Sequence, residues 1–283
     1  MHQIMHVSNG IHLLENMKLD ELAVTNICGC SNYGRQRRPM RFALCFLTAA
    51  AVSLSLPNAL HATCSQLKPD ATDAVATAPA HHKVILENDV VRVLEATVPL
   101  HAKEPPHTHF WPSVFFEQTS GANEPWKTVN IRWSQGGPSQ GFESSDRHRH
   151  NLLVELKNAD CQPAPLTDLP PTDAVKIHDP DISVILENEY VRVLSVRIAA
   201  GQKEPWHTHT WPAVVVYFSL PPSQRLEADG RKTPRAELKQ LEVRYDATAQ
   251  PTHSIENLGK VMYQAYRVEL KPTTKVAATK SVR

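Results

Sequence analysis

The pentapeptide VILEN at residues 84–88 decides the fold, because it returns unchanged at residues 184–188. Other segments return at the same offset of 100 residues (184 − 84), so the register does not drift between residues 72 and 112. They are TDAV at 72–75 and 172–175, VRVL at 91–94 and 191–194, KEP at 103–105 and 203–205, HTH at 107–109 and 207–209, and WP at 111–112 and 211–212. A fixed offset over this length indicates a duplicated domain. A unit of about 100 residues is large enough to bury its own core.

The composition favours an all-β protein and argues against a nucleic-acid binder. The 283 residues include 30 lysines and arginines against 29 aspartates and glutamates, which gives a formal net charge of +1. Nucleic-acid-binding proteins usually carry a basic excess or a basic stripe, and the only basic cluster here is residues 35–41. The 22 prolines, the 10 glycines and the scarcity of helical patterning after residue 60 predict short strands joined by many turns.

Each repeat carries the pattern of β-strands. Residues 91–98 and 191–198 are rich in β-branched side chains and partly alternate between apolar and polar residues. The apolar run VVVYF at residues 214–218 is typical of a strand that is covered on both faces. Short strands separated by proline and glycine favour a sandwich or a jelly roll. We therefore expect an all-β chain with two tandem jelly-roll β-barrels, at residues 81–157 and 175–271.

Two segments are expected to lie outside the barrels, and one loop is expected to be longer in the second copy. Residues 158–174 form a linker that is too rich in proline for a helix or an inner strand, and residues 272–283 are expected to be a disordered tail. Pro138 and Pro251 are matched in sequence at an offset of 113 (251 − 138), so the second copy holds 13 extra residues (113 − 100). The surplus falls around residues 221–236, a charged surface loop that could act as a lid.

The first sixty residues have the order of a secretory leader. Basic residues 35–41 precede an apolar stretch at residues 42–56, and the small residue Ala62 suits the position before a cleavage site. The apolar stretch is shorter than the roughly 20 residues that span a bilayer, so an uncleaved anchor is the less favoured alternative. A twin-arginine signal, or a lipoprotein attached at Cys64, fits the surrounding residues less well.

We therefore expect a leader at residues 1–62, with the signal peptide at 40–62 and residues 1–39 as untranslated sequence upstream of Met40. The alternative for the extreme N-terminus is a short amphipathic helix. The mature protein is expected to be secreted or periplasmic, without a membrane span.

Export would leave two cysteines in the mature chain. Cys28, Cys30 and Cys45 lie within the leader, so Cys64 and Cys161 would remain in an oxidising compartment. We predict a disulfide between them. Closing a loop of about 97 residues would contribute on the order of 4 kcal/mol of stability in the chain-entropy model.

The second repeat contains histidines in a spacing that suits a metal site. Five residues separate Gly201 from His207, and the side chains of His207 and His209 would project from the same face of a strand. A third histidine, His253, follows later, with Asn257 four residues after it. These residues resemble the two motifs of the cupin superfamily: glycine, five residues, His-x-His and a glutamate, then a histidine with an asparagine four residues on.

The resemblance covers residues 81–271 and is that of a two-domain bicupin. It implies a small jelly-roll barrel in each repeat, with a metal held inside the second barrel by His207, His209 and His253. The motif glutamate has no match, because Ala213 and Val214 stand in its place. A site of three histidines with water remains chemically reasonable, since imidazole suits several divalent transition metals. The expected cofactor is therefore one of Fe, Zn, Mn, Ni or Cu.

The first repeat matches the motifs less closely. His107 and His109 match the histidine pair, but His101 replaces the glycine. Alignment on Pro138 places Gln140 where the third histidine should be, so a degenerate or weakly occupied metal site is expected at His107, His109 and Gln140. Another His-x-His, at residues 148–150, lies off the motif and is expected at the surface.

Several further residues have both a functional and a structural interpretation. Trp111, Trp211 and Asn257 are candidates to line a ligand pocket, although the tryptophans could instead pack at the barrel mouth. The segment at residues 203–205 is expected to shape a turn. Glu256 is the nearest candidate in sequence for a general base. Both Arg92 and Arg192 are expected to be solvated or to act as cross-strand partners rather than to bind anions.

Two functions remain open from the sequence. The first is a metal-dependent dioxygenase or decarboxylase that acts on a small organic molecule in the second barrel, where three histidines would leave open coordination positions. The alternative is a non-catalytic protein that binds a metal or a small ligand, and a purely structural role would require that neither site binds metal. The expected partner is a small molecule, with a homodimer suggested only by analogy. The sequence leaves the substrate, the metal and the oligomeric state open.

Overall fold

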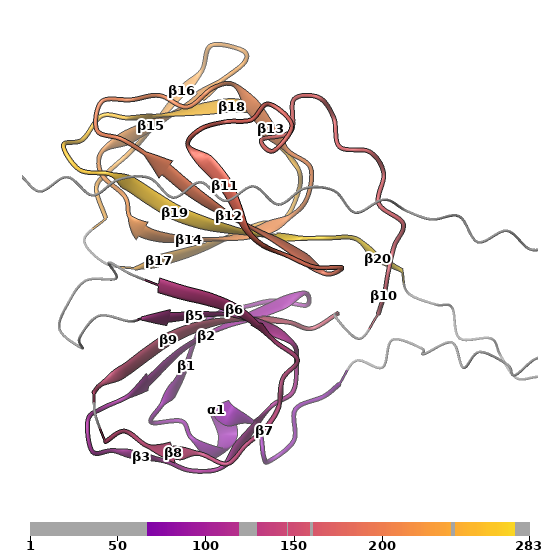
Figure 1. Cartoon of the computed structure of the whole chain (residues 1–283), viewed down its shortest axis with the longest axis vertical. Coiled ribbons are helices and arrows are strands. Elements are labelled where there is room, and N and C mark those ends of the chain that lie inside the picture. Colours follow the sequence, from indigo (N-terminus) through magenta and orange to yellow (C-terminus); the bar gives the residue numbers. More distant parts are fainter. Residues whose placement is uncertain (1–66, 119–128, 146, 159–160, 239–240, 275–283) are drawn as a thin grey trace, which may run out of the picture. The chain divides into compact units, whose positions relative to one another are not determined.

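The computed structural model describes residues 67–118, 129–145, 147–158, 161–238 and 241–274 (Figure 1). The predicted leader at residues 1–62 lies outside the described residues. The described part is nearly all β, and its only helix is the short α1 (Ala74–Thr77). No helix in the described part is both long enough and apolar enough to cross a membrane. The prediction of an all-β chain is confirmed.

The same five-stranded antiparallel sheet occurs in both repeats. In the first repeat its strands have the order β1-β2-β9-β5-β6, and in the second the order is β11-β12-β19-β14-β17. The bounds in the first repeat are β1 (His82–Glu87), β2 (Val91–Val98), β9 (Arg149–Leu156), β5 (Ser113–Gln118) and β6 (Val129–Ser134). Those in the second are β11 (Ile182–Glu187), β12 (Val191–Ile198), β19 (Tyr263–Leu270), β14 (Ala213–Ser219) and β17 (Glu242–Asp246). The duplicated sequence therefore forms a duplicated sheet.

Shorter strands form the second layer of each repeat and close it into a jelly-roll barrel. In the first repeat they are the pairs β3 (Lys103–Glu104) with β8 (Phe142–Glu143) and β4 (His107–His109) with β7 (Gly137–Ser139). In the second repeat a sheet of order β13-β18-β15-β16 takes this place. Its strands are β13 (His207–His209), β18 (Gln250–Asn257), β15 (Ser223–Glu227) and β16 (Lys232–Arg235). Figure 1 shows both curled units, one coloured indigo to magenta and the other orange to yellow.

The insertion at residues 221–236 contains a β-hairpin, where the sequence predicted only a surface loop. Strand β15 pairs with β18 on one side and with β16 on the other. The extra residues therefore widen the sheet that carries His207 and His253.

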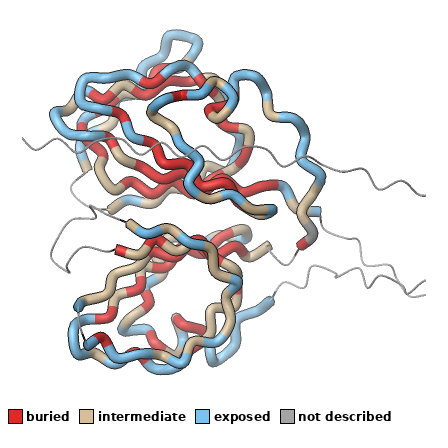
Figure 2. The backbone as a smooth tube through the Cα atoms, in the orientation of Figure 1, coloured by how far each residue is buried: buried red, intermediate tan, exposed pale blue. Residues whose placement is uncertain are grey.

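The central strands are covered on both faces, as their apolar composition indicates. On β2, Val91 and Val93 belong to the large hydrophobic core, whereas Leu94 and Ala96 belong to a smaller cluster with Leu153. The side chains of a strand alternate between its faces, so β2 contributes to two different cores. Figure 2 shows buried residues along these central strands and exposed residues toward the turns.

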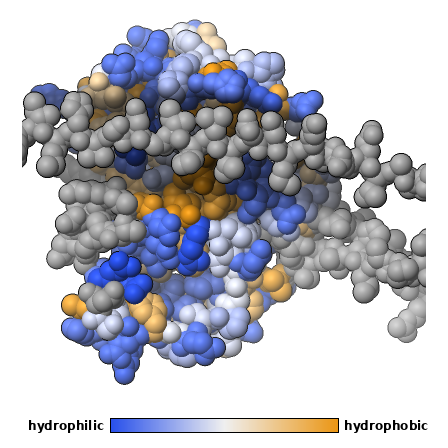
Figure 3. Space-filling view, in the orientation of Figure 1, coloured by the Kyte–Doolittle hydropathy of each residue, from blue (hydrophilic) through white to orange (hydrophobic). Residues whose placement is uncertain are grey.

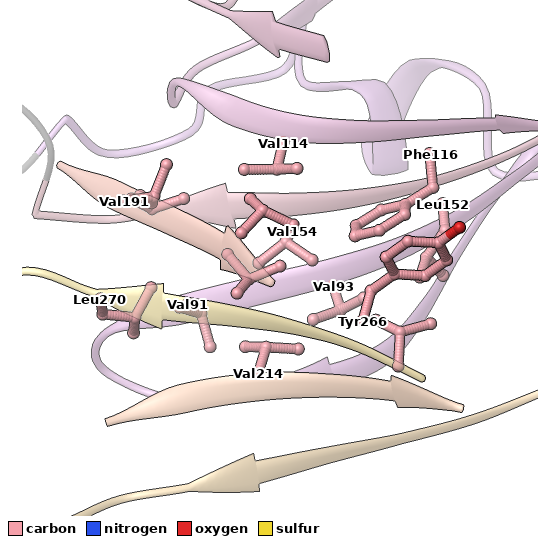
Figure 4. Packing of buried hydrophobic residues seen from close by; sticks show 14 residues of the cluster. Val91, Val93, Val114, Phe116, Leu152, Val154, Val191, Val214, Tyr266 and Leu270 are labelled. Carbon is pink, nitrogen blue, oxygen red and sulfur yellow. The ribbon is translucent and has the colours of Figure 1, made fainter. Parts of the chain in front are cut away.

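The large core contains side chains from both repeats, which belong to a single compact unit. Figure 4 shows Val91, Val114 and Val154 of the first repeat together with Val214 and Leu270 of the second. The rings of Phe116 and Tyr266 lie 5.6 Å apart within this cluster. On the face of the molecule seen in Figure 3, most of the described surface is hydrophilic.

The linker and the start of the tail are joined by strand pairing. Strand β10 (Gln162–Pro163) pairs with β20 (Thr273–Thr274). The prediction of a disordered tail from residue 272 is therefore wrong for Thr273 and Thr274, while residues 275–283 lie outside the described part. Cys161 is buried and disulfide-bonded. Cys64 lies outside the described residues, so its pairing with Cys161 stays a prediction.

Candidate metal centres

In the second barrel, His207, His209 and His253 lie together, as the motif resemblance predicted. His207 and His209 sit on β13, and the antiparallel pairing with β18 places His253 directly opposite His207. The ring centroids are 4.9 Å apart for His207 and His209, 4.6 Å for His207 and His253, and 5.5 Å for His209 and His253. Potential ligand atoms of the three side chains lie within 4.8 Å of one another. We refer to these three residues as the second cluster.

The hydrogen bonds of the second cluster leave one nitrogen of each ring available for a metal. The Nδ1 atoms of His207 and His253 donate to the backbone carbonyls of Pro205 (2.9 Å) and Pro251 (2.8 Å), and Nδ1 of His209 contacts Oε1 of Glu269 at 3.0 Å. Engaged Nδ1 atoms fix the ring orientation and leave Nε2 as the ligand atom. The Nε2 atom of His207 is buried without a hydrogen-bond partner. The second cluster therefore fits a metal ion.

Burial keeps the imidazoles of the second cluster neutral, which is the form that binds metals. It lowers the pKa of His253 to about 2, with the guanidinium of Arg225 acting in the same direction. Burial, together with Arg267, also holds the pKa of His209 well below its usual value. The pKa of His207 is lowered by burial, although its bond to Pro205 acts in the opposite direction.

A carboxylate that sequence reasoning assigned to a turn lies beside the second cluster. Glu204 is 2% exposed, and its Oε1 atom lies 3.8 Å from Nε2 of His207. Oε1 also accepts a hydrogen bond from the backbone N–H of Ile255, whereas Oε2 is buried without a partner. Burial, reinforced by the carboxylate of Asp179, raises the pKa of Glu204 well above its usual value. The recurrence of the KEP segment in both repeats was the available sequence signal.

In the first barrel the third histidine is His82 on β1, and the prediction of Gln140 is wrong. His82, His107 and His109 have potential ligand atoms within 4.8 Å of one another, and we refer to them as the first cluster. The ring of His82 lies 4.7 Å from that of His107 and 5.3 Å from that of His109. Gln140 is exposed and is not among the described residues that line the cavity beside this cluster.

The strand register explains why Gln140 was the wrong choice. His107 pairs with Ser139 on β7, just as His207 pairs with His253 on β18. The structural counterpart of His253 is therefore Ser139, and the alignment on proline was displaced by one residue. A displacement of one position sends the side chain to the opposite face of the strand.

Two of the three histidines of the first cluster have the same hydrogen-bonded support as their counterparts in the second. Nδ1 of His107 donates to the carbonyl of Pro105 (2.9 Å), and Nδ1 of His109 contacts Oε1 of Glu155 at 3.0 Å. Oε1 of Glu104 lies 3.6 Å from Nε2 of His82, whose Nδ1 is buried without a partner. Burial, reinforced by the two neighbouring histidines, lowers the pKa of His82 to about 3.

A buried chain of charges fixes one histidine in each barrel. In the second barrel, Glu269 accepts from Nε of Arg192 at 2.5 Å and also holds His209, while Arg192 bonds Asp173 at 3.1 Å. In the first barrel the same chain runs from Asp73 through Arg92 and Glu155 to His109. The two arginines are thus cross-strand partners of the glutamates, and they are buried rather than solvated.

Trp111, Trp211 and Asn257 lie away from the histidine clusters and make contacts that support the fold. Trp111 and Trp211 each pack against the guanidinium of a buried arginine, at 4.6 Å in both repeats. Among the described residues that line the two histidine cavities, neither tryptophan is present. The side chain of Asn257 donates to the carbonyls of Ile198 and Val261 and so holds two turns together.

Two other predicted residues also face away from the clusters. On β18, alternate side chains of His253 and Ile255 point into the cavity, which turns Glu256 to the other face, where it accepts from Gln224. The catalytic role suggested for Glu256 is therefore not supported by its position. His150 is half-buried and contacts Glu95 at 2.9 Å, away from the first cluster.

The glycine of the first motif marks a turn with a left-handed backbone. Gly201 has a φ of +71°, and its N–H donates to the carbonyl of Asn257. His101, its counterpart, keeps this conformation with a φ of +64°. The turn is therefore present in both barrels, although only one has the residue that favours it.

The cavities beside the two clusters differ in size and lining. The second cavity has a volume of about 40 Å³, and Glu204, Tyr217 and Arg235 are among its lining residues. The first cavity is much larger, at about 570 Å³, with Glu117, Phe142 and Ser139 in its wall.

Comparisons with models of known protein families and with curated protein sequences found no match. Among solved structures, a cupin domain from Bordetella pertussis Tohama I is 22% identical over 32% of this chain and 92% of its own, with a TM-score of 0.27. A gentisate adduct of salicylate 1,2-dioxygenase from Pseudoaminobacter salicylatoxidans is 10% identical over 65% of this chain and 70% of its own, with a TM-score of 0.37. A formate complex of oxalate decarboxylase from Lactobacillus farciminis is 11% identical over 70% of this chain and 86% of its own, with a TM-score of 0.36.

The fold of the chain is established by its own strand order. Both repeats have the same jelly-roll sheet. In the second barrel the antiparallel pairing of β13 with β18 brings the His-x-His strand beside His253, and Gly201 donates to the carbonyl of Asn257 at a turn. The chain therefore folds into two tandem jelly-roll barrels, and the histidine motifs of the second barrel resemble those of cupins.

Proposed function

We propose that this protein is a metal-dependent enzyme that acts on a small organic molecule, with its active site at the second cluster. The observation that carries the proposal is the set of three buried imidazoles whose Nδ1 atoms are all engaged, which directs Nε2 of each ring to the same place. Three neutral histidines leave open coordination positions for water or substrate on a divalent transition metal. A dioxygenase or a decarboxylase is the reaction type that the bicupin resemblance implies.

The residues around the cluster have separate roles in this proposal. His207, His209 and His253 would hold the metal, and Glu269 would orient His209. Glu204 would lie beside the ligand His207, with Oε1 at 3.8 Å from its Nε2 atom and with Oε2 buried without a hydrogen-bond partner. When bound, the metal would supply a Lewis acid or a redox centre.

The first cluster supports a second metal site in the same chain. Its three rings have nearly the same mutual distances as those of the second cluster. We therefore extend the proposal of metal binding, though not of catalysis, to His82, His107 and His109.

Metal analysis tests the proposal directly. Native protein and the variants His207→Ala and His82→Ala are compared for bound transition metal, and each variant is expected to lose the metal of its own barrel only. Oxygen uptake and carbon dioxide release are then measured with a panel of small organic acids. Wild-type protein that holds no metal after purification without chelators, and takes up none on addition, would contradict the proposal.

A non-catalytic binding protein is the second candidate, and one observation favours it. The cavity of the second barrel, at about 40 Å³, leaves little space for an organic substrate. Bound metal without turnover of any compound in the panel would favour this alternative.

We also propose that the protein is exported, on the sequence pattern of residues 40–62. The N-terminal sequence of the mature protein, isolated from the cells that make it, tests this proposal. A chain that begins at Thr63 and is found outside the cytoplasm is expected.

A further inference from the structure

Arginines crowd the cavity of the second barrel. Among the described residues, four arginines line it, each from a different strand: Arg225 on β15, Arg235 on β16, Arg244 on β17 and Arg267 on β19. The same cavity is lined by the second cluster. These positive charges would repel a metal cation at the second cluster unless negative groups neutralise them.

The carboxylates of the protein neutralise only part of this charge. Arg244 and Arg267 share Asp246, at 3.0 and 2.8 Å, and Arg225 bonds Glu227 at 2.6 Å. Arg235 contacts no carboxylate in the described part of the chain.

Within the described residues, the Arg235 side chain donates from Nη1 to the hydroxyl of Tyr217, at 3.4 Å. The carboxylate of Glu204, which also lines the cavity, accepts from the backbone N–H of Ile255 instead of from an arginine. A positive surplus therefore remains in the cavity.

Two tyrosines add neutral donors to the same wall. Tyr217 and Tyr263 lie with their ring centroids 6.3 Å apart, and both line the cavity. Burial raises the pKa of Tyr263 well above its usual value, so its hydroxyl keeps the proton. Guanidinium groups and hydroxyl donors together are the groups that bind carboxylates in proteins.

The first barrel lacks this arrangement where the two can be compared. Glu117 stands at the position of Tyr217 (217 − 117 = 100), and it pairs with Arg132 at 3.0 Å. Two of the arginines, Arg225 and Arg235, belong to the hairpin inserted only in the second copy. The insertion therefore changes the electrostatics of one cavity and not of the other.

We propose that the cavity of the second barrel is a subsite for a small carboxylate, with Arg235 as its main receptor. The proposal deepens the proposed function, since it names the class of substrate, and it rests on that function only for the metal. The volume of about 40 Å³ holds roughly three water-sized groups, which is the size of one carboxylate group. A ligand therefore places a carboxylate between Arg235 and the second cluster.

Acetate and its neutral isostere acetamide test the subsite. Binding of each is measured by calorimetry at low ionic strength, on full-length protein with and without added zinc, for wild type and Arg235→Gln. Acetate is expected to bind, and the neutral acetamide is expected not to bind. Arg235→Gln should weaken acetate binding by on the order of 10-fold or more, as expected when a charge-assisted pair of hydrogen bonds is lost.

The matched control is Arg231→Gln in the same hairpin. Arg231 is exposed and pairs with Asp229 outside the cavity, so this variant should bind acetate as wild type does. Arg235→Lys keeps the charge and should recover part of the affinity. Arg225→Gln is the second cavity variant and is used if Arg235→Gln fails to fold.

The outcomes separate the two proposals. Zinc binding together with acetate affinity that is unchanged in both cavity variants overturns the subsite and leaves the metal centre standing. Acetate binding that depends on Arg235, in protein that takes up no zinc, supports the subsite and contradicts the metal-dependent enzyme. Equal binding of acetate and acetamide also overturns the subsite.

Discussion

The two barrels share a sheet and a histidine pair, yet they take their third histidine from different strands. In the first barrel it is His82 on β1, where the second barrel has Ile182. In the second it is His253 on β18, where the first barrel has Ser139. The third ring lies 4.7 or 4.6 Å from the first histidine of the pair. The comparison teaches that the distance of the third imidazole from the histidine pair is preserved, while the strand that supplies it is not.

Removal of the third histidine should produce the largest effect. His82→Ala and His253→Ala should each lower the metal affinity of one barrel by on the order of 100-fold or more. Removing a ligand lowers the affinity more than removing a residue that only supports a ligand, which costs about 10- to 100-fold. Zinc content and titration of each variant measure this effect. Gln140→Ala is the control, and a loss of zinc in that variant would break the comparison.

The supporting glutamates should produce the next largest effect, and it should be equal in the two barrels. Glu155→Gln and Glu269→Gln weaken the contact to His109 and His209, so metal affinity should fall by about 10- to 100-fold. Both variants should also be less stable, because a buried arginine loses a charged partner. Glu256→Gln, on the outer face of β18, should leave zinc affinity unchanged.

An exchange of ligand positions would sharpen the comparison further. In the double variant Ile182→His and His253→Ser, the third histidine of the second barrel comes from β11, as it does from β1 in the first barrel. The double variant should bind zinc about 10-fold more tightly than His253→Ser alone, because Ile182 lines the same cavity as the histidine pair. Equal affinity of the single and double variants would show that the strands are not interchangeable.

The smallest effect is expected at the turn that differs between the copies. His101 has a left-handed backbone, which costs free energy for every residue except glycine. The variant His101→Gly should therefore raise the free energy of unfolding by about 1 kcal/mol. Gly201→Ala should lower it by a similar amount, because an added Cβ would meet nothing within 4 Å and only the backbone is strained. Urea unfolding measures both values, and stabilisation by Gly201→Ala would contradict the argument.

The duplication and the second cluster could be predicted from the sequence because their residues keep fixed spacings. The His-x-His strand, His253 and Asn257 follow a motif, and the structure brings the three histidines together. His82 could not be found in this way, since it lies 25 residues before His107 (107 − 82) on a strand that the motif does not include. Its signal was a difference between the repeats, a histidine where the other copy has Ile182.

Other site residues were missed because spacing carries no information on burial. Glu104 and Glu204 belong to a segment that looked like a turn, and only the packing shows that both are buried beside histidines. The inserted residues 221–236 were predicted to be a loop, because their charges and prolines resemble those of loops. Pairing with β18 turns them into a hairpin whose arginines face the cavity.

The arginine-lined cavity has a consequence for the rate at which metal enters. A positive field along an entry path lowers the local concentration of cations and slows their association. A divalent ion should therefore enter the second barrel slowly through its small cavity and, once bound, leave slowly as well. The first barrel, with its cavity of about 570 Å³, should exchange its ion with solution much faster. One chain would thus hold a labile ion and a kinetically trapped one, each bound by three imidazoles.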